Sequence, residues 1–347
     1  MSKFLGLFLL GLILTSVAQA TDIKAQEFQI LDRDREFETM LAQLDLESST
    51  FTLEYKSTGT SLGFKVYSGE KSFGKFLPLN EGTNPEAQIV SYRLGQFLHL
   101  GTLVVPSGAY VLSATLVSQF QALLLGKTET QRIRAQNQQN LLAAIEKDST
   151  RLAGVFTPHI KKWEVKDLGD SVTNTIDPTN PIADWIRAEG PMPSGSHLIT
   201  LKGVKAKKGE KQPMASELEL SREFSQILVL DVLCGQWDRW SGGNIEATID
   251  PATGHLAFFA RDNGGASMKG TGSIDATLRV VSRFDRDQIS RVQRLLQILK
   301  SSDAKALTDA LQLKSDPKSL RARASALLDQ VQVLIGQYGE DQVYFPK

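Results

Sequence analysis

The sequence has few of the residues from which cysteine and histidine sites are built. Its 347 residues include one cysteine, Cys234, and four histidines. An intramolecular disulfide and a cysteine-based zinc site are therefore excluded. An excess of charge of one sign is also lacking, because 39 Lys and Arg residues balance 39 Asp and Glu residues. Such a chain has no overall basic field to hold nucleic acid, so we expect function to depend on carboxylates, amides, glycines and lysines.

Long apolar runs are confined to the N-terminus. Lys3 precedes an apolar run from Phe4 to Val17, and Ala18-Gln19-Ala20 has the small-x-small pattern that signal peptidase reads. The 14 residues of this run are fewer than the roughly 20 that span a bilayer. We expect residues 1–20 to be a signal peptide cut after Ala20. The mature protein is then secreted or periplasmic, with no stable membrane anchor.

The rest of the chain has ordinary globular composition, with 41% hydrophobic and 22% charged residues. At about 150 residues per domain, its length predicts two domains or two lobes. Turns separate three short strands, which predicts an antiparallel meander, and Asn84-Pro85-Glu86 opens an amphipathic helix that Gly101 stops. The expected strands are Phe51 to Lys56, Gly63 to Tyr67, and Phe73 to Leu79.

The second half of the chain contains a strongly apolar helix followed by a hairpin. Glu217 to Cys234 is apolar over nearly every face of its second half, which predicts a buried helix ending at Gly235. A loop then leads to two expected strands, Ile245 to Ile249 and His255 to Ala260. From Arg283 onward the pattern is helical. These elements predict a helical second lobe with one hairpin.

Several common catalytic motifs are incomplete or missing. Gly69 to Lys75 fits the G-x4-G-K spacing of a phosphate loop, but Phe76 stands where Ser or Thr must hold the metal, and a strand follows. The sequence has no G-x-S-x-G elbow, no H-E-x-x-H and no G-x-G-x-x-G that opens a helix. Walker, hydrolase, zincin and dinucleotide-binding functions therefore lack their local signals. Trp237 and Trp240 are expected to pack in the core.

Two carboxylates follow strongly apolar elements. Asp238 comes after the predicted buried helix, and Asp262 comes after the hairpin. A carboxylate is costly to desolvate there without a partner such as a metal ion. Asn244 adds a neutral oxygen between them. Taken singly, the residues also fit a structural ion pair in Asp238-Arg239 and a plain turn at Asp262.

The order of polar residues along the chain is that of a phosphoryl-transfer site. In such sites one Asp aligns the hydroxyl nucleophile, an Asn and a second Asp hold magnesium, and a strand Lys paired with a helix Glu grips the phosphates. Lys75 on the third strand and Glu86 at the start of the next helix supply the last pair. The turn from Ser57 to Ser61, which includes Gly59, is placed to cover phosphates with backbone N–H groups.

These motifs resemble the atypical branch of the protein-kinase-like superfamily. That branch includes the HipA kinases, the secretory-pathway casein kinases of the Golgi, the spore-coat CotH kinases and the phosphatidylinositol kinases. Gly74 to Leu79 is similar to its third strand, and Glu86 with Arg93-Leu94-Gly95 is similar to its Glu-bearing helix. Leu230 to Arg239 resembles its catalytic segment, and Arg261 to Gly264 resembles its metal-binding Asp-Asn-Gly.

The resemblance implies an α+β, two-lobe protein-kinase-like fold. Residues 21–160 would form a small β-rich N-lobe with one helix, and residues 161–347 a larger helical C-lobe. ATP and Mg²⁺ or Mn²⁺ would be the cofactors. By this resemblance Lys75, Gly59 and Ser61 would bind the nucleotide, Glu86 would anchor Lys75, Asp238 would be the catalytic base, and Asn244 and Asp262 would ligate the metal.

The sequence departs from the family pattern in its catalytic segment. Gln236 replaces the usual Asn, Trp240 replaces the usual His, and Asn244 stands six residues after Asp238, where kinase loops give five.

The favoured function is an exported kinase that transfers the γ-phosphoryl of ATP to a hydroxyl of a protein Ser or Thr. The alternatives are a lipid or small-molecule kinase, a pseudokinase acting as a binding module or scaffold, and a structural or adhesion role.

Overall fold

The structure of the chain is a computed structural model. It describes residues 22–56, 59, 61–80, 83–165, 168–170, 175–206, 208–237, 239, 244–250, 253–266, 268 and 278–347. The predicted signal peptide, Asp238 and Trp240 lie outside the described residues.

A five-stranded antiparallel sheet forms the body of the N-lobe. Its strand order is β1-β2-β3-β5-β4, so the three predicted strands are extended by two that return from later in the chain. In register, Lys75 on β3 pairs with Lys65 on β2 and with Thr157 on β5. The strands are β1 (Phe51–Tyr55), β2 (Phe64–Ser68), β3 (Lys71–Pro78), β4 (Gly108–Ser113) and β5 (Arg151–Pro158).

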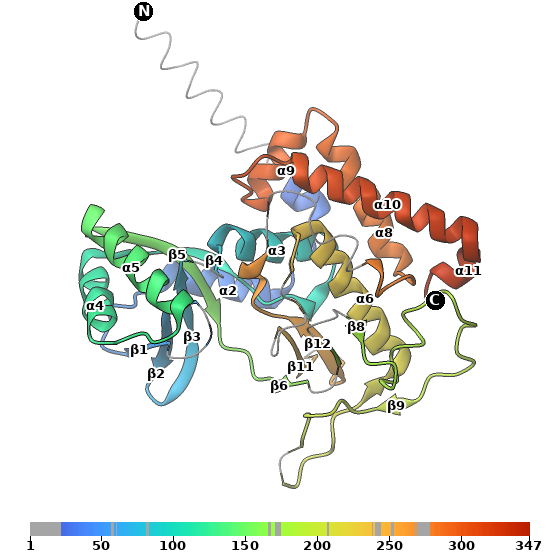
Figure 1. Ribbon diagram of the computed structural model, residues 1–347, viewed down its shortest axis with the longest axis horizontal. Helices are drawn as coiled ribbons and strands as arrows, with labels where there is room; N and C mark the ends of the chain where they lie inside the picture. Colours follow the sequence, from blue (N-terminus) through green and yellow to red (C-terminus); the bar gives the residue numbers. More distant parts are fainter. Residues whose placement is uncertain are drawn as a thin grey trace, which may run out of the picture.

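The helices of this half lie on both sides of the sheet. Figure 1 shows α4 and α5 beside the outer end of the sheet, and α3 between the sheet and the C-lobe helices. The N-lobe thus carries α2, α4 and α5 in addition to the one helix that the resemblance implies. The helices are α2 (Asp32–Gln43), α3 (Pro85–Phe97), the 3₁₀ turn η1 (Gly101–Leu103), α4 (Ala114–Leu125) and α5 (Arg132–Lys147).

The C-lobe is built on a buried helix and a hairpin beneath it. Helix α6 (Glu217–Cys234) packs on β12 (Leu256–Ala260), which pairs with β11 (Ile245–Ile249) and through it with β6 (Trp163–Glu164). The terminal helices stack above α6 (Figure 1). They and the short elements are β7 (Gly169–Asp170), β8 (Thr175–Ile176), β9 (Leu198–Ile199), β10 (Ala215–Ser216), η2 (Asn263–Gly265), α8 (Arg286–Leu299), α9 (Ala304–Leu311), α10 (Lys318–Tyr338) and α11 (Glu340–Val343).

Local capping signals fix the two helices that position the site. At the start of α3, the Asn84 side chain accepts hydrogen bonds from the N–H groups of Glu86 and Ala87, with Pro85 in the first turn. At the start of α6, Ser216 and Glu219 form a capping box. Gly235 ends α6 in the left-handed conformation, with φ of 66°. The predicted bounds of α6 agree with the structure.

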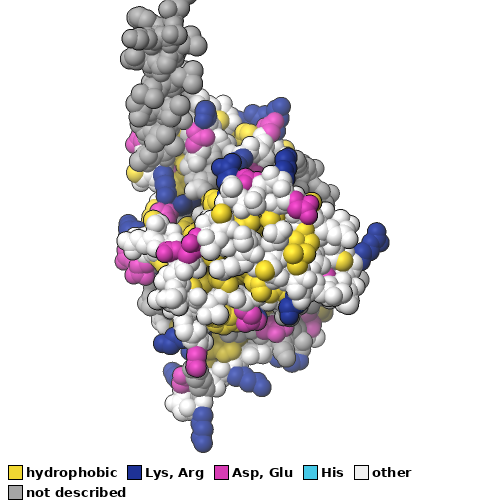
Figure 2. Space-filling view, turned by 90° about the vertical axis from the view of Figure 1, so that its left-hand side faces the viewer, with side chains coloured by type: hydrophobic (Ala, Val, Ile, Leu, Met, Phe, Trp, Pro, Cys, Tyr) yellow, Lys and Arg dark blue, Asp and Glu magenta, His cyan; other side chains and the backbone are white. Residues whose placement is uncertain are grey.

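One large apolar core joins the sheet, α3, α6 and the terminal helices. On the face of the N-lobe seen in Figure 2, apolar side chains gather near the centre, and basic and acidic side chains are interspersed around them. Within the ranges given above, no helix is both long and apolar enough to cross a bilayer.

Candidate functional site

A cavity of about 310 Å³ lies between the sheet, α3 and the end of the β11–β12 hairpin. Lys75 reaches it from β3, Gln88 from α3, and Asp262 from the loop after β12. The end of β5 and the chain that joins it to β6 line another wall through Thr157 to Ile160 and Lys162. The cavity therefore gathers side chains from segments nearly 190 residues apart in the sequence, and it joins Lys75 and Asp262 as predicted from the motif order.

Lys75 and Asp262 form the electrostatic centre of this cavity. Burial lowers the pKa of Lys75, and the negative charge of Asp262 opposes that effect. Burial would raise the pKa of Asp262, but Lys75, Lys56 and Arg261 hold it below its ordinary value. Asp262 is therefore ionised at neutral pH and faces several cations.

Three buried polar atoms on the cavity wall have no hydrogen-bond partner among the described residues. They are the Asp262 Oδ1, Gln88 Oε1 and Thr157 Oγ1 atoms. Buried polar atoms are nearly always satisfied in folded proteins, so three around one cavity, from α3, β5 and the loop after β12, indicate room for a polar ligand. Asp262 also has a left-handed backbone, with φ of 54°, a conformation that costs energy in a residue other than glycine and clusters at functional sites.

Arg239 ties the catalytic segment to the Asp262 loop. Its guanidinium bonds both Asp231 oxygens on α6 at 2.8 Å and the Asn263 Oδ1 at 2.6 Å. It also donates to the backbone oxygens of Asn244 and Arg261. All five N–H donors of the side chain are thus used. Among the described residues, Arg239 forms its ion pair with Asp231, whose carboxylate meets the guanidinium fork from the buried helix; the alternative of a structural pair with Asp238 falls on a residue outside the described ranges.

The turn between β1 and β2 carries the two predicted nucleotide-binding residues. Gly59 has φ of +76°, a conformation that favours glycine. Ser61 is buried, and its Oγ accepts a hydrogen bond from the Lys56 Nζ at 2.7 Å. Lys56 is a site residue that the motif comparison did not single out.

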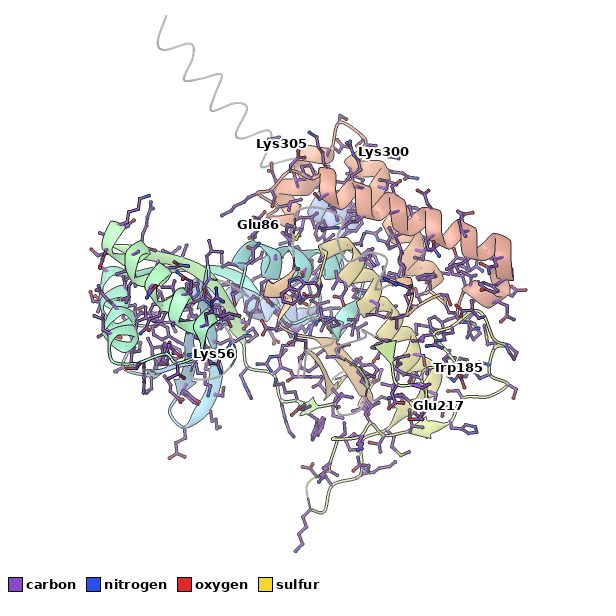
Figure 3. The ribbon with its side chains drawn as sticks, viewed as in Figure 1. Lys56, Glu86, Trp185, Glu217, Lys300 and Lys305 are labelled. Atoms are coloured by element: carbon purple, nitrogen blue, oxygen red, sulfur yellow. The ribbon has the colours of Figure 1, made fainter. Side chains whose placement is uncertain are left out.

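Glu86 does not anchor Lys75 in this structure. Its Oε1 accepts hydrogen bonds from the N–H groups of Lys314 and Ser315 and from the Ser315 Oγ. In Figure 3 it lies on the side of α3 that faces the terminal helices, away from Lys56. Because a helix turns 100° per residue, Gln88 projects to the opposite side and lines the cavity. The expected pair is thus corrected: the α3 residue at the cavity is an amide.

A second set of charges borders the cavity beside the segment that joins β5 to β6. Glu246 on β11 is buried and bonds Arg261 over 2.9 Å and also Lys162. Burial lowers the pKa of Lys162, and its bond to Glu246 opposes that effect. Gly74 lets β3 approach β5 here, since a Cβ would stand 2.6 Å from the Thr157 backbone oxygen. Glu246 and Lys162 were not predicted as site residues, because neither belongs to one of the motifs.

The remaining predicted residues are placed as follows. Asn244 is buried, and its backbone oxygen is bound by Arg239 and by the Arg261 N–H. Gln236 donates to the Asp262 backbone oxygen at 3.2 Å. Trp237 is 60% exposed, so the expectation of core packing is wrong for this residue, which follows the end of α6 and leaves the core with the loop. Asp238 lies outside the described residues.

A metal ion at this site would rely on Asp262. In the described part of the chain, no group of three or more His, Cys, Asp or Glu side chains could hold one. Magnesium is commonly bound by one or two carboxylates together with substrate phosphates and water. The unpaired Asp262 Oδ1 fits that kind of shared site, in which the phosphates supply most of the ligands.

Comparisons with known proteins agree on the fold. No family model and no curated protein matches the sequence. A crystal structure of the Golgi casein kinase with Mn/ADP bound matches with a TM-score of 0.59 and 13% identity, over 92% of this chain and 80% of that one. A second structure of the Golgi casein kinase gives 0.58 and 14%, over 92% and 81%. The structure of hydra Fam20 with sugar gives 0.54 and 14%, over 94% and 97%.

These matches cover 92–94% of this chain, so the shared fold extends to both lobes. At 13–14% identity they establish the fold, and the chemistry has to be argued from the residues of this chain. The resemblance predicted from four short motifs is confirmed at that level. The chain has the atypical protein-kinase-like fold of the Golgi casein kinase and hydra Fam20.

Proposed function

We propose that this protein is an exported, ATP-dependent kinase that transfers the γ-phosphoryl group to a hydroxyl of a protein Ser or Thr. The observation that carries the proposal is the meeting of Lys75 and Asp262 in one cavity. In this arrangement Lys75 binds phosphate oxygens and Asp262 holds Mg²⁺ or Mn²⁺. The Golgi casein kinase of the same fold has Mn/ADP bound, which supports a nucleotide and a divalent cation as cofactors.

The proposed division of labour follows the two lobes. The sheet brings Lys75 and the turn with Gly59 and Ser61, which cover the phosphates. The C-lobe brings Asp262 and, from the resemblance, Asn244 as a second metal ligand and Asp238 as the base that accepts the hydroxyl proton. When bound, the metal would offset negative charge on the transferring phosphoryl group. Arg239 keeps the two C-lobe segments together.

A thermal-shift titration tests nucleotide binding. The mature chain from Thr21 would be titrated with ATP and Mg²⁺ or Mn²⁺. A ligand at one hundred times its dissociation constant stabilises a protein by about 2.7 kcal/mol, a shift of a few degrees. We expect a metal-dependent shift that Asp262→Ala abolishes. Asp303→Ala serves as the matched control, because this exposed residue makes no side-chain cap bond. The absence of a shift with any nucleotide would end the proposal.

Phosphoryl transfer needs its own assay. Labelled γ-phosphate from ATP should appear on protein Ser or Thr in a panel of dephosphorylated protein, lipid and small-molecule acceptors, and Asp238→Ala should abolish the transfer. Label on a lipid or small molecule alone would reassign the acceptor class. Sequencing of the exported protein should find Thr21 at its N-terminus, because export is proposed through cleavage after Ala20.

One observation favours a second function, a nucleotide-binding module without transferase activity. Active protein kinases need the ion pair between the strand Lys and a helix Glu. The α3 residue at this cavity is the neutral Gln88, whose Nε2 bonds the Ser107 Oγ at 3.1 Å. Nucleotide binding without any labelled acceptor, combined with intact biological activity of Asp238→Ala, would support this function over the kinase.

A further inference from the structure

A second lysine belongs to the electrostatic cluster of the cavity. Lys56 directly follows β1 and is partly buried. Burial and the positive charge of Lys75 lower the pKa of its ammonium group to about 8, while the charge of Asp262 opposes both effects. The register of the sheet agrees with this: the Lys56 N–H bonds the Gly63 oxygen just before β2 at 2.9 Å, and Lys65 on β2 pairs with Lys75 on β3.

The Lys56 side chain folds inward over its own turn. Its Nζ donates to the Ser61 Oγ over 2.7 Å, and a Cβ at Gly59 would stand 3.4 Å from the same Nζ. The ammonium group therefore lies between the two residues predicted to cover phosphates. Figure 3 shows Lys56 on the side of the sheet lobe that faces the C-lobe.

The turn is held from its outer side by a buried arginine. Arg134 on α5 donates to the backbone oxygens of Lys56 and Gly59, at 3.0 and 2.8 Å. Glu129 in turn binds Arg134 through both carboxylate oxygens at 2.6 Å. The backbone of Lys56 and of Gly59 is therefore held by α5 before any ligand arrives. A fixed turn reduces the entropy lost when a ligand binds.

Among the described residues, the cavity has more cations than carboxylates. Lys56 and Lys75 lie near Asp262, and Arg261 and Lys162 bind Glu246. Lys65 also lines the cavity but pairs with the exposed Glu54. Apart from that pair, four cationic side chains face two carboxylates, an excess of two positive charges. Lysines near one another repel unless an anion is shared between them. The arrangement suits a ligand with several negative charges and gives no advantage to an uncharged one.

We propose that Lys56 is a second phosphate-binding cation, which contacts the phosphate chain of a nucleoside triphosphate from the turn while Lys75 contacts it from β3. The proposal rests on the proposed function, since it takes the cavity to be a nucleotide site. It assigns Lys56 to recognition of the polyphosphate, with the nucleoside bound elsewhere in the cavity. The ammonium exchanges its hydrogen bond to Ser61 for one to a phosphate oxygen, or shares its donors between them.

Calorimetric titrations of the mature protein test the assignment with three probes: ATP, adenosine and inorganic tripolyphosphate. Lys56→Met should weaken the binding of ATP and tripolyphosphate by about tenfold or more, the loss expected for a hydrogen bond between charged groups. It should leave the affinity for adenosine unchanged. Lys56→Arg keeps the charge and should bind all three within about threefold of the wild type. Lys71→Met, an exposed lysine on β3, is the matched control and should equal the wild type.

The outcomes separate this proposal from the kinase proposal. If ATP binds the wild type and Lys56→Met equally well, Lys56 has no phosphate role and the nucleotide site stands. If ATP does not bind the wild type but tripolyphosphate does, and Lys56→Met weakens it, the nucleotide site fails and the anion site stands. If neither anion binds the wild type, both proposals fail. Circular dichroism of each variant confirms folding, and Lys56→Gln replaces Lys56→Met if that variant does not fold.

Discussion

Removing the Arg239 guanidinium should destabilise the protein more than removing an exposed charged side chain does. Asp231 is 1% exposed and Arg239 is 3% exposed, and the guanidinium uses all its donors on Asp231, Asn263 and two backbone oxygens. Breaking a buried ion pair by deleting one partner costs about 3–5 kcal/mol, because the remaining charge is left without compensation. Domains are stable by only about 5–15 kcal/mol in total.

The assay is urea unfolding followed by circular dichroism. Arg239→Met should lower the free energy of unfolding by about 3–5 kcal/mol, and Asp231→Leu added to it should recover part of that loss, since an apolar pair replaces the stranded carboxylate. The recovery stays incomplete because the oxygens of Asn244 and Arg261 remain without their donor. The control is Arg35→Met, whose exposed partner is Asp32, with an expected loss below about 1 kcal/mol.

Two results would refute this reasoning. A loss below about 1 kcal/mol for Arg239→Met would mean that the buried pair contributes no more than a surface pair. A double variant less stable than Arg239→Met would mean that the uncompensated Asp231 charge is not the source of the loss. Arg239→Lys keeps the charge but has an ammonium group with three donors and no planar fork. Its free energy of unfolding should lie between those of the wild type and Arg239→Met.

Three further predictions concern single side chains. Glu86→Ala should lower the free energy of unfolding by about 1–3 kcal/mol, since it removes the hydrogen bonds to Lys314 and Ser315. It should leave the affinity for ATP unchanged. A loss of ATP binding in calorimetry would mean that Glu86 does act together with Lys75. The ATP affinity of the wild type should fall as pH rises above about 8, where free Lys56 loses its proton. The Lys56→Arg variant should keep its ATP affinity to higher pH. The same dependence of ATP affinity on pH in both proteins would contradict this prediction. Burial raises the pKa of Glu223 to about 8. Between about pH 4.5 and 8 the folded state therefore holds a proton that the unfolded state has released, so the free energy of unfolding should fall as pH rises through this range. In urea titrations, Glu223→Gln should reduce this dependence on pH.

The sequence predicted those elements whose signals are local. The bounds of α6 follow from Ser216, the capping-box Glu219 and Gly235, which are adjacent to the residues they cap. The β11–β12 hairpin follows from a turn between two apolar runs. The sheet was only partly predicted. Strand β4 pairs with β5, and β5 pairs with β3, and such long-range pairing depends on the packing of the whole lobe.

The site shows the same division between local and long-range information. The Asp-Asn-Gly after β12 and the lysine on β3 were found by motif, and they do meet in the cavity. The face of α3 that reaches the cavity was not found, because the rotation of a helix about its axis is fixed by its neighbours. Here the bonds from Glu86 to the loop after α9 fix that rotation and place Gln88 inward. Lys56 was missed because its position depends on Arg134, 78 residues away.

These contacts make the two lobes depend on each other at the cavity. Helix α3 belongs to the N-lobe in sequence, yet Glu86 holds it to the loop before α10, and the Asn84 N–H bonds the Gly264 oxygen beside Asp262 at 2.9 Å. The turn with Lys56 is held instead by α5 of the N-lobe. Gln88 and Asp262 therefore move with the C-lobe, and Lys56 with the sheet. A ligand that bridges Lys56 and Asp262 would have to join these two bodies, so its binding should protect amides of both the β1–β2 turn and the Asp262 loop from hydrogen exchange.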